Sequence, residues 1–353
     1  MKKTEMTAMA RVVTAIGHQE ADRVPFFLLL TMHGAGFLDM SIREYFSKAE
    51  NVARGQLFMR TRYGHDCIYA FFYAAIEIQA WGGEIIWSDI GPPNAGEPFL
   101  RNAENIRSLS PPKVRETDCL CRVLQAIAIL KEQCGDEVPI IGVVMSPFSL
   151  PVMQMGFDRY IELIYEQPEL FRHLMKINEA FCTDWANAQV AAGAAAICYF
   201  DPVSSASIIP PDMYAETGFE IAQRTLARIK APTASHMASG RCLPIVSRIA
   251  RTGTALVGVS SLEDLAELKK LCAGKTGLLG NLNGIEMQRW TRKDAETKVR
   301  EAIAAAGPGG GFILSDNHGE IPLQVSDETL MHISEAVRTW GRYPLTWTKH
   351  HAP

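Results

Sequence analysis

Short apolar runs alternate with amphipathic stretches of helical period along almost the whole chain. Strands that alternate with helices are typical of a parallel sheet whose crossovers are helical. The apolar runs that we interpret as buried strands are residues 24–30, 66–69, 139–145, 194–199, 233–236, 255–259, 276–280 and 311–314. This is the strand number that closes a (β/α)₈ barrel. We therefore predict an α/β fold, a (β/α)₈ TIM barrel that forms a single domain over residues 1–353, with a short helical extension over about residues 1–20.

Capping residues mark the beginnings of several predicted helices. Ser41 followed by Glu44 has the spacing of a capping box, and Pro168 has the fixed φ angle that suits a first helical turn. Ser261 is predicted to cap a third helix that has acidic residues in its first turn. Two further helices are predicted over residues 295–306 and 4–16, the latter outside the barrel.

Composition and charge exclude several classes of protein. The net charge is −4 and charged residues make up 21% of the chain, so no basic footprint for a nucleic acid is present. The apolar run 24–32 is about half of the roughly 20 residues that a membrane span requires. Eight scattered cysteines without a paired framework, and an N-terminus without an apolar signal core, favour a reducing compartment. We expect a soluble, cytoplasmic protein that binds neither nucleic acid nor membrane, with a homodimer as a possible assembly.

Polar residues follow the predicted strands, at the ends where a parallel barrel carries its chemistry. These candidates are His33, Asp89, Asp201, Ser204, His236, Asn281, Asn283, Asp316, His318 and Glu320. Asp89 belongs to an extension, residues 83–89, inserted after the second predicted strand. Several of these side chains are expected to share one pocket, with Met145 and Met153 as apolar lining. Cys242 is expected to be a packed core thiol within a helical pattern.

Four stretches together resemble the barrel-mouth motifs of the uroporphyrinogen decarboxylase superfamily. They are 198–202 (Cys-Tyr-Phe-Asp-Pro), 235–240 (Ser-His-Met-Ala-Ser-Gly), 279–283 (Leu-Gly-Asn-Leu-Asn) and 312–322, which contains Asp316 and His318. The resemblance extends over nearly the whole chain, because residues 22–25, 75–89 and 208–214 also resemble motifs of the family.

The superfamily has a decarboxylase branch, whose arginines bind the carboxylates of a porphyrinogen. Here the matching stretch is Met32-His33-Gly34-Ala35-Gly36-Phe37, which contains no arginine. Residues 146–153 also lack the tyrosine of that branch. Without bidentate arginines, recognition of a polycarboxylate is weakened. A decarboxylase of a tetrapyrrole or smaller acid is therefore the alternative prediction, and a non-catalytic binding barrel is a third.

The other branch contains corrinoid-linked methyltransferases, and residues 75–89 resemble it more closely. The resemblance implies a corrinoid-dependent methyltransferase that moves a methyl group between a small methyl donor or acceptor and a corrinoid carried on a partner protein. Enzymes of this branch hold zinc through a His-x-Cys pair and a second cysteine. His236 matches the histidine, whereas Ala238 and His318 occupy the two thiolate positions.

These matches define the predicted site. The expected catalytic residues are His236, His318 and Asp89, and the expected substrate-binding residues are His33, Asp201, Asn281, Met145 and Met153. Zinc is a possible cofactor, held by His236, His318 and a carboxylate such as Glu320, Asp316 or Asp201. A metal-free role also stays open, because a neutral histidine can act as an acid or a base toward a substrate oxygen.

Overall fold

A computed structural model describes residues 5–350 of the chain. Within this range, seven parallel strands form one curled sheet in the order β1-β4-β5-β6-β7-β8-β9. The strands are β1 (Ile68–Tyr69), β4 (Ile140–Met145), β5 (Ala196–Phe200), β6 (Thr233–His236), β7 (Leu256–Gly258), β8 (Gly277–Leu282) and β9 (Phe312–Asp316). Each lies within one or two residues of a predicted strand, which confirms the predicted α/β barrel class.

The segment around Phe26 closes the sheet between β9 and β1. Phe26 forms a parallel bridge with Leu314, and its carbonyl accepts a hydrogen bond of 2.8 Å from the N–H of Asp66. The eighth predicted strand, 24–30, is therefore an extended segment with a single bridge. The reason is that carboxylates replace its ladder partners: Asp66 accepts from the N–H of Phe26 and Asp316 from the N–H of Leu29.

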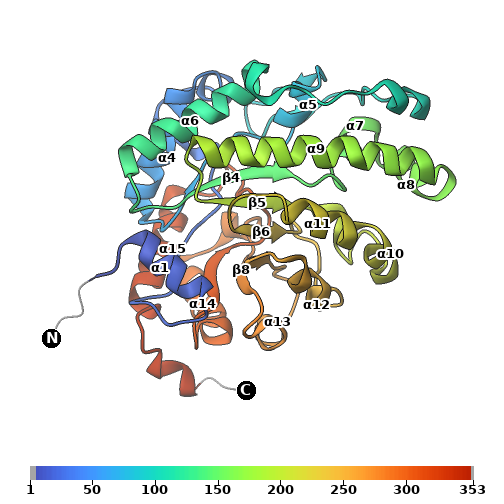
Figure 1. Ribbon diagram of the computed structural model, residues 1–353. Helices are drawn as coiled ribbons and strands as arrows, with labels where there is room; N and C mark the ends of the chain where they lie inside the picture. The colour runs from blue at the N-terminus through green and yellow to red at the C-terminus, as the bar shows by residue number, and fades with distance from the viewer. Residues whose placement is uncertain (1–4, 351–353) are drawn as a thin grey trace.

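Helices surround the sheet, and in Figure 1 the long α9 crosses above β4 and β5. The α-helices are α1 (Ala8–Ile16), α2 (His33–Phe37), α3 (Ile42–Tyr45), α4 (Ala49–Tyr63), α5 (Ile76–Ala80), α6 (Asp118–Cys134), α7 (Pro151–Met155), α8 (Phe157–Glu166), α9 (Pro168–Ala192), α10 (Pro211–Glu216), α11 (Gly218–Leu226), α12 (Val246–Ile249), α13 (Leu265–Cys272), α14 (Arg292–Ala306) and α15 (Asp327–Trp340). Short 3₁₀ helices are η1 (Ala103–Ser108), η2 (Val114–Glu116), η3 (Pro202–Ser204), η4 (Ala250–Thr252), η5 (Glu286–Arg289) and η6 (Thr346–His350).

The predicted helix starts at Ser41 and Pro168 are confirmed, since Ser41 caps α3 and Pro168 opens α9. The predicted cap Ser261 is wrong. Asp264 caps α13 instead, because its carboxylate accepts hydrogen bonds from the N–H groups of Ala266 and Glu267. The leading helix begins at Ala8, and Thr4, where its start was predicted, lies outside the described residues.

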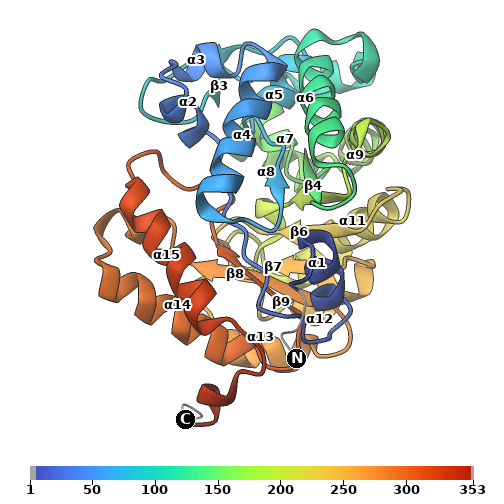
Figure 2. The same ribbon diagram turned by 90° about the vertical axis from the view of Figure 1, so that its left-hand side faces the viewer.

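The barrel has an interior core and an end cover. Alternate strand residues point inward, and those of all the main strands and of the closing segment gather in one cluster that includes Phe27, Tyr69, Val143, Cys198 and Ile313. Figure 2, in which the left-hand side of Figure 1 faces the viewer, shows α1 in front of the strands. Helix α1 therefore covers the end of the barrel where the strands begin, and the opposite end forms the mouth.

A hairpin of β2 (Ile85–Ile86) and β3 (Asn94–Ala95) follows α5. The side-chain amide of Gln324, in the loop after β9, donates a hydrogen bond of 2.7 Å to the carbonyl of Ile90. The hairpin is thereby joined to a loop of the barrel mouth. No helix in the described part of the chain combines the length and the apolar character needed to cross a bilayer.

Candidate functional site

Four paired residues form one row across the inner wall of the barrel mouth. The register pairs Met145 with Phe200, Phe200 with His236, and His236 with Gly258, on β4 to β7. Phe200 and His236 are two residues beyond the inward-facing Cys198 and Ala234, so their side chains also face inward. The strand ends therefore bring together two of the predicted site residues, Met145 and His236.

His236 is held in one orientation and one protonation state. Its ring is completely buried and stacks on the ring of Phe200, with centroids 5.3 Å apart and planes at 16°. Its Nδ1 accepts a hydrogen bond of 3.1 Å from the N–H of Ala238, which places the proton of the neutral ring on Nε2. Burial, and after it the neighbouring His318, lowers the pKa of His236 to about 4. Nε2 has no hydrogen-bond partner in the protein, so the mouth contains a buried donor without an acceptor.

Gly258 makes room for this imidazole. A Cβ atom at position 258 would lie 2.4 Å from Cδ2 of His236, much closer than van der Waals contact. The imidazole of His236 can therefore occupy its observed position only because residue 258 of β7 is a glycine.

The loop after β9 presents His318 beside His236. The carboxylate of Asp316 accepts hydrogen bonds from the N–H groups of His318 and Gly319, at 3.1 and 3.3 Å, and this shapes the loop. Burial lowers the pKa of the half-buried His318 below its usual value, so this imidazole is also neutral near pH 7. The structure thus brings together the two predicted catalytic histidines.

Glu320 lies on the same loop and forms a hydrogen bond with the Thr31 hydroxyl. Burial raises the pKa of Glu320 to about 8, and the nearby Asp316 adds to the effect. Tyr69, beneath this loop, donates a hydrogen bond to the carbonyl of Gly319. Glu320 is therefore a protonated acid near neutral pH, held by Thr31 directly after the closing segment.

Asn281 and Ser315 lie opposite each other on β8 and β9. Ser315 is two residues beyond the inward-facing Ile313, so its side chain also faces inward. The amide of Asn281 donates a hydrogen bond of 3.2 Å to the carbonyl of Ser260, which orders the mouth. The hydroxyl of Ser315 is buried and has no hydrogen-bond partner in the protein.

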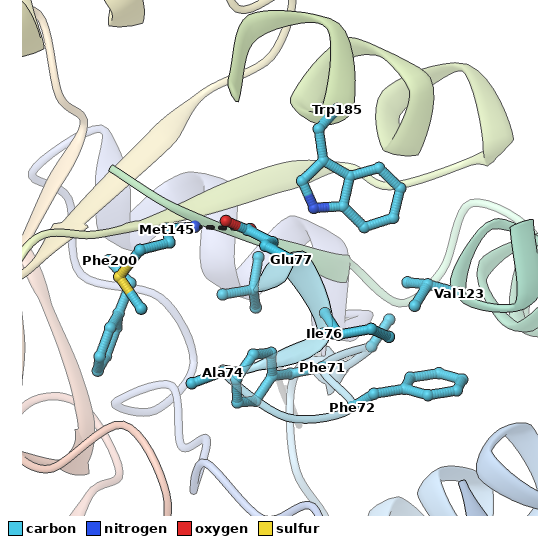
Figure 3. Close-up of a pocket in the computed structure, with 11 residues that line it drawn as sticks. Phe71, Phe72, Ala74, Ile76, Glu77, Val123, Met145, Trp185 and Phe200 are labelled. Atoms are coloured by element: carbon cyan, nitrogen blue, oxygen red, sulfur yellow. Dashed lines mark hydrogen bonds between the residues drawn. The ribbon is translucent and has the colours of Figure 1, made fainter. Parts of the chain in front are cut away.

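A small cavity of about 20 Å³ opens where β1 ends early beside β4, and Figure 3 shows the side chains that surround it. Phe71, Met145 and Phe200 contribute from the barrel side and Trp185 from α9. Glu77 also lines the cavity, and Figure 3 shows its carboxylate directed to β4, where Oε1 accepts a hydrogen bond of 2.8 Å from the N–H of Met145. Burial raises the pKa of Glu77 to about 8, so this side chain is a neutral acid that replaces the missing strand partner of β4.

Three other predicted residues lie behind or beside the mouth. Asp201 is buried, and its Oδ1 accepts hydrogen bonds of 2.5 and 2.6 Å from the hydroxyls of Ser146 and Ser149. The Nε2 of the buried His33 lies 3.3 Å from the carbonyl of Val325, and burial lowers the pKa of His33 to about 4. Met153 is half-buried on α7 and packs on the outer core. Asp201 therefore holds the loop after β4 through Ser146 and Ser149, and His33 contacts the loop before α15 through Val325.

Asp89 lies in the exposed connection of the β2–β3 hairpin. It is on the rim of the mouth rather than in the row that holds His236. Cys242 is completely buried, as expected of a core thiol, but it lies in a loop and not in a helix. Its N–H donates a hydrogen bond to the carboxylate of Glu263. The loop after β7, which contains Glu263, therefore fixes the position of Cys242.

The geometry does not match the predicted zinc site. Among residues 5–350, no three His, Cys, Asp or Glu side chains are grouped so that they could hold a metal ion. In addition, zinc binds a histidine nitrogen that carries no proton, whereas the contact between Nδ1 of His236 and the Ala238 N–H leaves the proton on Nε2. The described residues therefore do not fit the set of His236, His318 and Glu320 as a metal centre.

Sequence reasoning missed Phe200, Glu77 and Ser315. Phe200 directly precedes the predicted Asp201, and the alternation of strand residues would have placed it in the barrel. Glu77 lies in a stretch that carried the family resemblance, but its partner Met145 is 68 residues away. No local pattern indicates that contact.

Comparison with known proteins gives a family match and two kinds of relatives. The family model described as uroporphyrinogen decarboxylase (URO-D) matches residues 7–340. A methylcobamide:CoM methyltransferase (MtaA) of Methanosarcina barkeri is 28% identical over 193 residues, 54% of this chain and 56% of that protein. A uroporphyrinogen decarboxylase of Thioalkalivibrio sulfidiphilus is 26% identical over 239 residues, 63% of this chain and 65% of that protein. The matches thus span between half and two thirds of these relatives.

Among solved structures, a methyltransferase from Methanosarcina mazei superposes with a TM-score of 0.84 at 21% identity. The superposition covers 95% of this chain and 99% of the other. This likeness supports the barrel fold over nearly the whole length.

Proposed function

Because the chain belongs to the uroporphyrinogen decarboxylase family, we propose that it is an enzyme of the methyltransferase kind found in that family. In this proposal it moves a methyl group between a small donor or acceptor and a corrinoid carried by a partner protein. The observation that carries the proposal is His236, a neutral imidazole whose Nε2–H is buried in the mouth without a partner. An unsatisfied buried donor is unfavourable by about 1–3 kcal/mol, and a ligand oxygen would satisfy it.

The chain's own groups suit transfer from a methyl group bound to oxygen. The Nε2–H of His236 donates to the oxygen and stabilises negative charge as the C–O bond breaks. Glu320, whose pKa burial raises to about 8, then gives its proton to the leaving oxygen, and the product is an alcohol or phenol. The partner's corrinoid would supply reduced Co(I), whose electron pair would form the bond to the methyl carbon while the C–O electron pair stays with the leaving oxygen. No protein-bound metal takes part in these steps.

The environment of the site favours this reaction over decarboxylation of a porphyrinogen. A polycarboxylate requires fixed cations, of which bidentate arginines are the usual choice. At the position of the arginine motif, this chain has α2 with a buried His33, whose pKa burial lowers to about 4. The two histidines of the mouth are neutral as well. Neutral hydrogen-bonding groups suit an uncharged substrate.

The rim of the mouth suits a partner protein. Five exposed large apolar side chains lie at this end: Ile86 on β2, and Ile90, Ile208, Leu262 and Ile285 on loops. Clustered exposed apolar groups often mark sites of protein association. Docking here would bring a cofactor carried by the partner over His236 and His318.

The proposal is tested under anaerobic conditions with the full chain, cob(I)alamin and a series of methyl donors. The series compares oxygen-bound, nitrogen-bound and sulfur-bound methyl groups. The expected result is formation of methylcobalamin, followed by absorbance, with at least one oxygen-bound donor. Absence of methylcobalamin with every donor, in a folded preparation, would count against the proposal.

A further inference from the structure

A second cavity lies at the opposite end of the barrel from the candidate site. It is an apolar chamber of about 100 Å³, bounded by inward-facing side chains of the strands. Helix α1 covers it with Met9, Val12, Val13 and Ile16, at the end of the barrel that faces the viewer in Figure 2. We call this cavity the floor chamber.

Small side chains account for the space. Barrels of this type are usually filled by layers of large branched side chains. Here the inward positions include Cys67, Ala196, Cys198 and Ala234. These side chains are too short to meet in the middle, so the floor of the barrel is left incompletely packed.

Helix α1 is fixed over this gap and is not loosely placed. The N–H of Gly311 donates a hydrogen bond of 2.7 Å to the carbonyl of Ala15 at the end of α1. Arg11 forms ion pairs of 2.6 Å with both Asp22 and Asp66, and its side chain is almost completely buried. The cover therefore preserves the chamber instead of collapsing into it.

The walls of the floor chamber determine what it can hold. None of the described residues that line it carries a charge, and most contribute only carbon or sulfur atoms. Tyr69 and Thr233 contribute hydroxyls, and the hydroxyl of Tyr69 is directed to the carbonyl of Gly319 at the mouth. Apolar cavities of this kind stay dry and accept apolar guests, since water needs two or more polar partners.

A small molecule has a route into the chamber. Val13 is 59% exposed, and the lining residues Ile141, Ala196 and Ala234 are only half-buried. Entry is therefore possible between α1 and the starts of β4, β5 and β6, without unfolding of the barrel.

We propose that the floor chamber is a binding site for a small uncharged apolar molecule, smaller than benzene. The size limit follows from the volume, because a cavity of about 150 Å³ holds benzene or xenon and this one is about 100 Å³. The site is separate from the mouth and does not depend on the proposed methyl transfer.

Xenon is the probe that tests this site. The ¹²⁹Xe chemical shift is measured with the full chain, with Ala234→Leu, which fills the chamber, and with Ala266→Leu as the control. Ala266 is exposed on α13, so its substitution leaves the chamber open. The wild type and the control are expected to give the same protein-dependent shift, and Ala234→Leu is expected to lose it. A folded Ala234→Leu variant that keeps the full shift would overturn the proposal.

Crystals of the wild type under xenon pressure decide the matter if Ala234→Leu does not fold. A xenon atom among Cys67, Cys198 and Ala234 supports the site. Density for xenon elsewhere only, or none, overturns it.

Discussion

The phenyl ring of Phe200 stacks nearly parallel to the imidazole of His236, with ring centroids 5.3 Å apart and an angle of 16° between the planes. The two residues are register partners on β5 and β6. Together with the hydrogen bond from Ala238 to Nδ1, the stack fixes the direction of Nε2. The donor is therefore in place before a ligand arrives, which is the condition for efficient electrostatic stabilisation.

Replacement of His236 by Ala removes this donor. A hydrogen bond to a group that gains charge contributes about 1.5–3 kcal/mol, and each 1.36 kcal/mol changes a rate about tenfold. We expect kcat/KM for methyl transfer to fall roughly tenfold to a hundredfold. His173→Ala is the control, since His173 is exposed on α9. If His236→Ala is as active as His173→Ala, His236 does not contribute to methyl transfer.

Gly258→Ala tests the space that the imidazole needs. The new Cβ would lie 2.4 Å from His236 Cδ2, so the ring must move. We expect a loss of about 1–3 kcal/mol in the free energy of unfolding, together with a fall in activity similar to that of His236→Ala. Gly36→Ala is the matched control, because a Cβ there meets nothing within 4 Å. Urea unfolding and activity are measured on both, and an unchanged Gly258→Ala enzyme would contradict the observed ring position.

Glu77→Gln tests whether the acid beside Trp185 is neutral. Burial raises the pKa of Glu77 from 4.5 to about 8. Between these values the unfolded chain releases the proton and the folded chain keeps it, so the free energy of unfolding falls as pH rises. This contribution is complete below pH 4.5 and is lost by about pH 8. Glutamine cannot ionise. The free energy of unfolding of Glu77→Gln, measured relative to that of the wild type, is therefore expected to increase from pH 5 to pH 8.

The control for this series is Glu50→Gln, because Glu50 is exposed on α4. Its difference from the wild type is expected to stay nearly constant with pH. Parallel curves for Glu77→Gln and the wild type would mean that Glu77 is ionised in the folded chain.

Elemental analysis tests the mismatch between the mouth and the predicted zinc set. The full chain and His236→Ala are incubated with zinc, and free metal is removed by gel filtration. Because no three-ligand group is formed among the described residues, both proteins are expected to retain far less than one zinc per chain. If the wild type retains one zinc per chain and His236→Ala or His318→Ala loses it, the predicted zinc site is present and the mismatch is contradicted.

The strands were predictable because each is a short apolar run buried on both faces of a parallel sheet. The cap of α13 was not, since both Ser261 and Asp264 are good capping residues. The choice depends on tertiary structure: the Ser261 hydroxyl hydrogen bonds with the side-chain amide of Asn317 in the loop after β9. The carboxylate of Asp264 remains available to α13.

The site was predictable to the extent that strand ends meet at one face. His236, His318, Asn281 and Met145 were selected by that rule, and each lies at or just beyond the mouth end of a strand. The rule does not say which way a side chain points, so it also selected Asp201, whose carboxylate is held by Ser146 and Ser149. Long-range contacts, such as that of Glu77 with Met145, leave no mark in the local sequence.

The most direct test compares the proposed methyl transfer with decarboxylation of uroporphyrinogen in one preparation of the full chain. Transfer of a ¹³C-labelled methyl group to cob(I)alamin is followed by NMR, and conversion of uroporphyrinogen is followed by chromatography. The proposed function predicts labelled methylcobalamin from the wild type, much less from His236→Ala, and no decarboxylated porphyrinogen. Decarboxylation of uroporphyrinogen without any methyl transfer would contradict it.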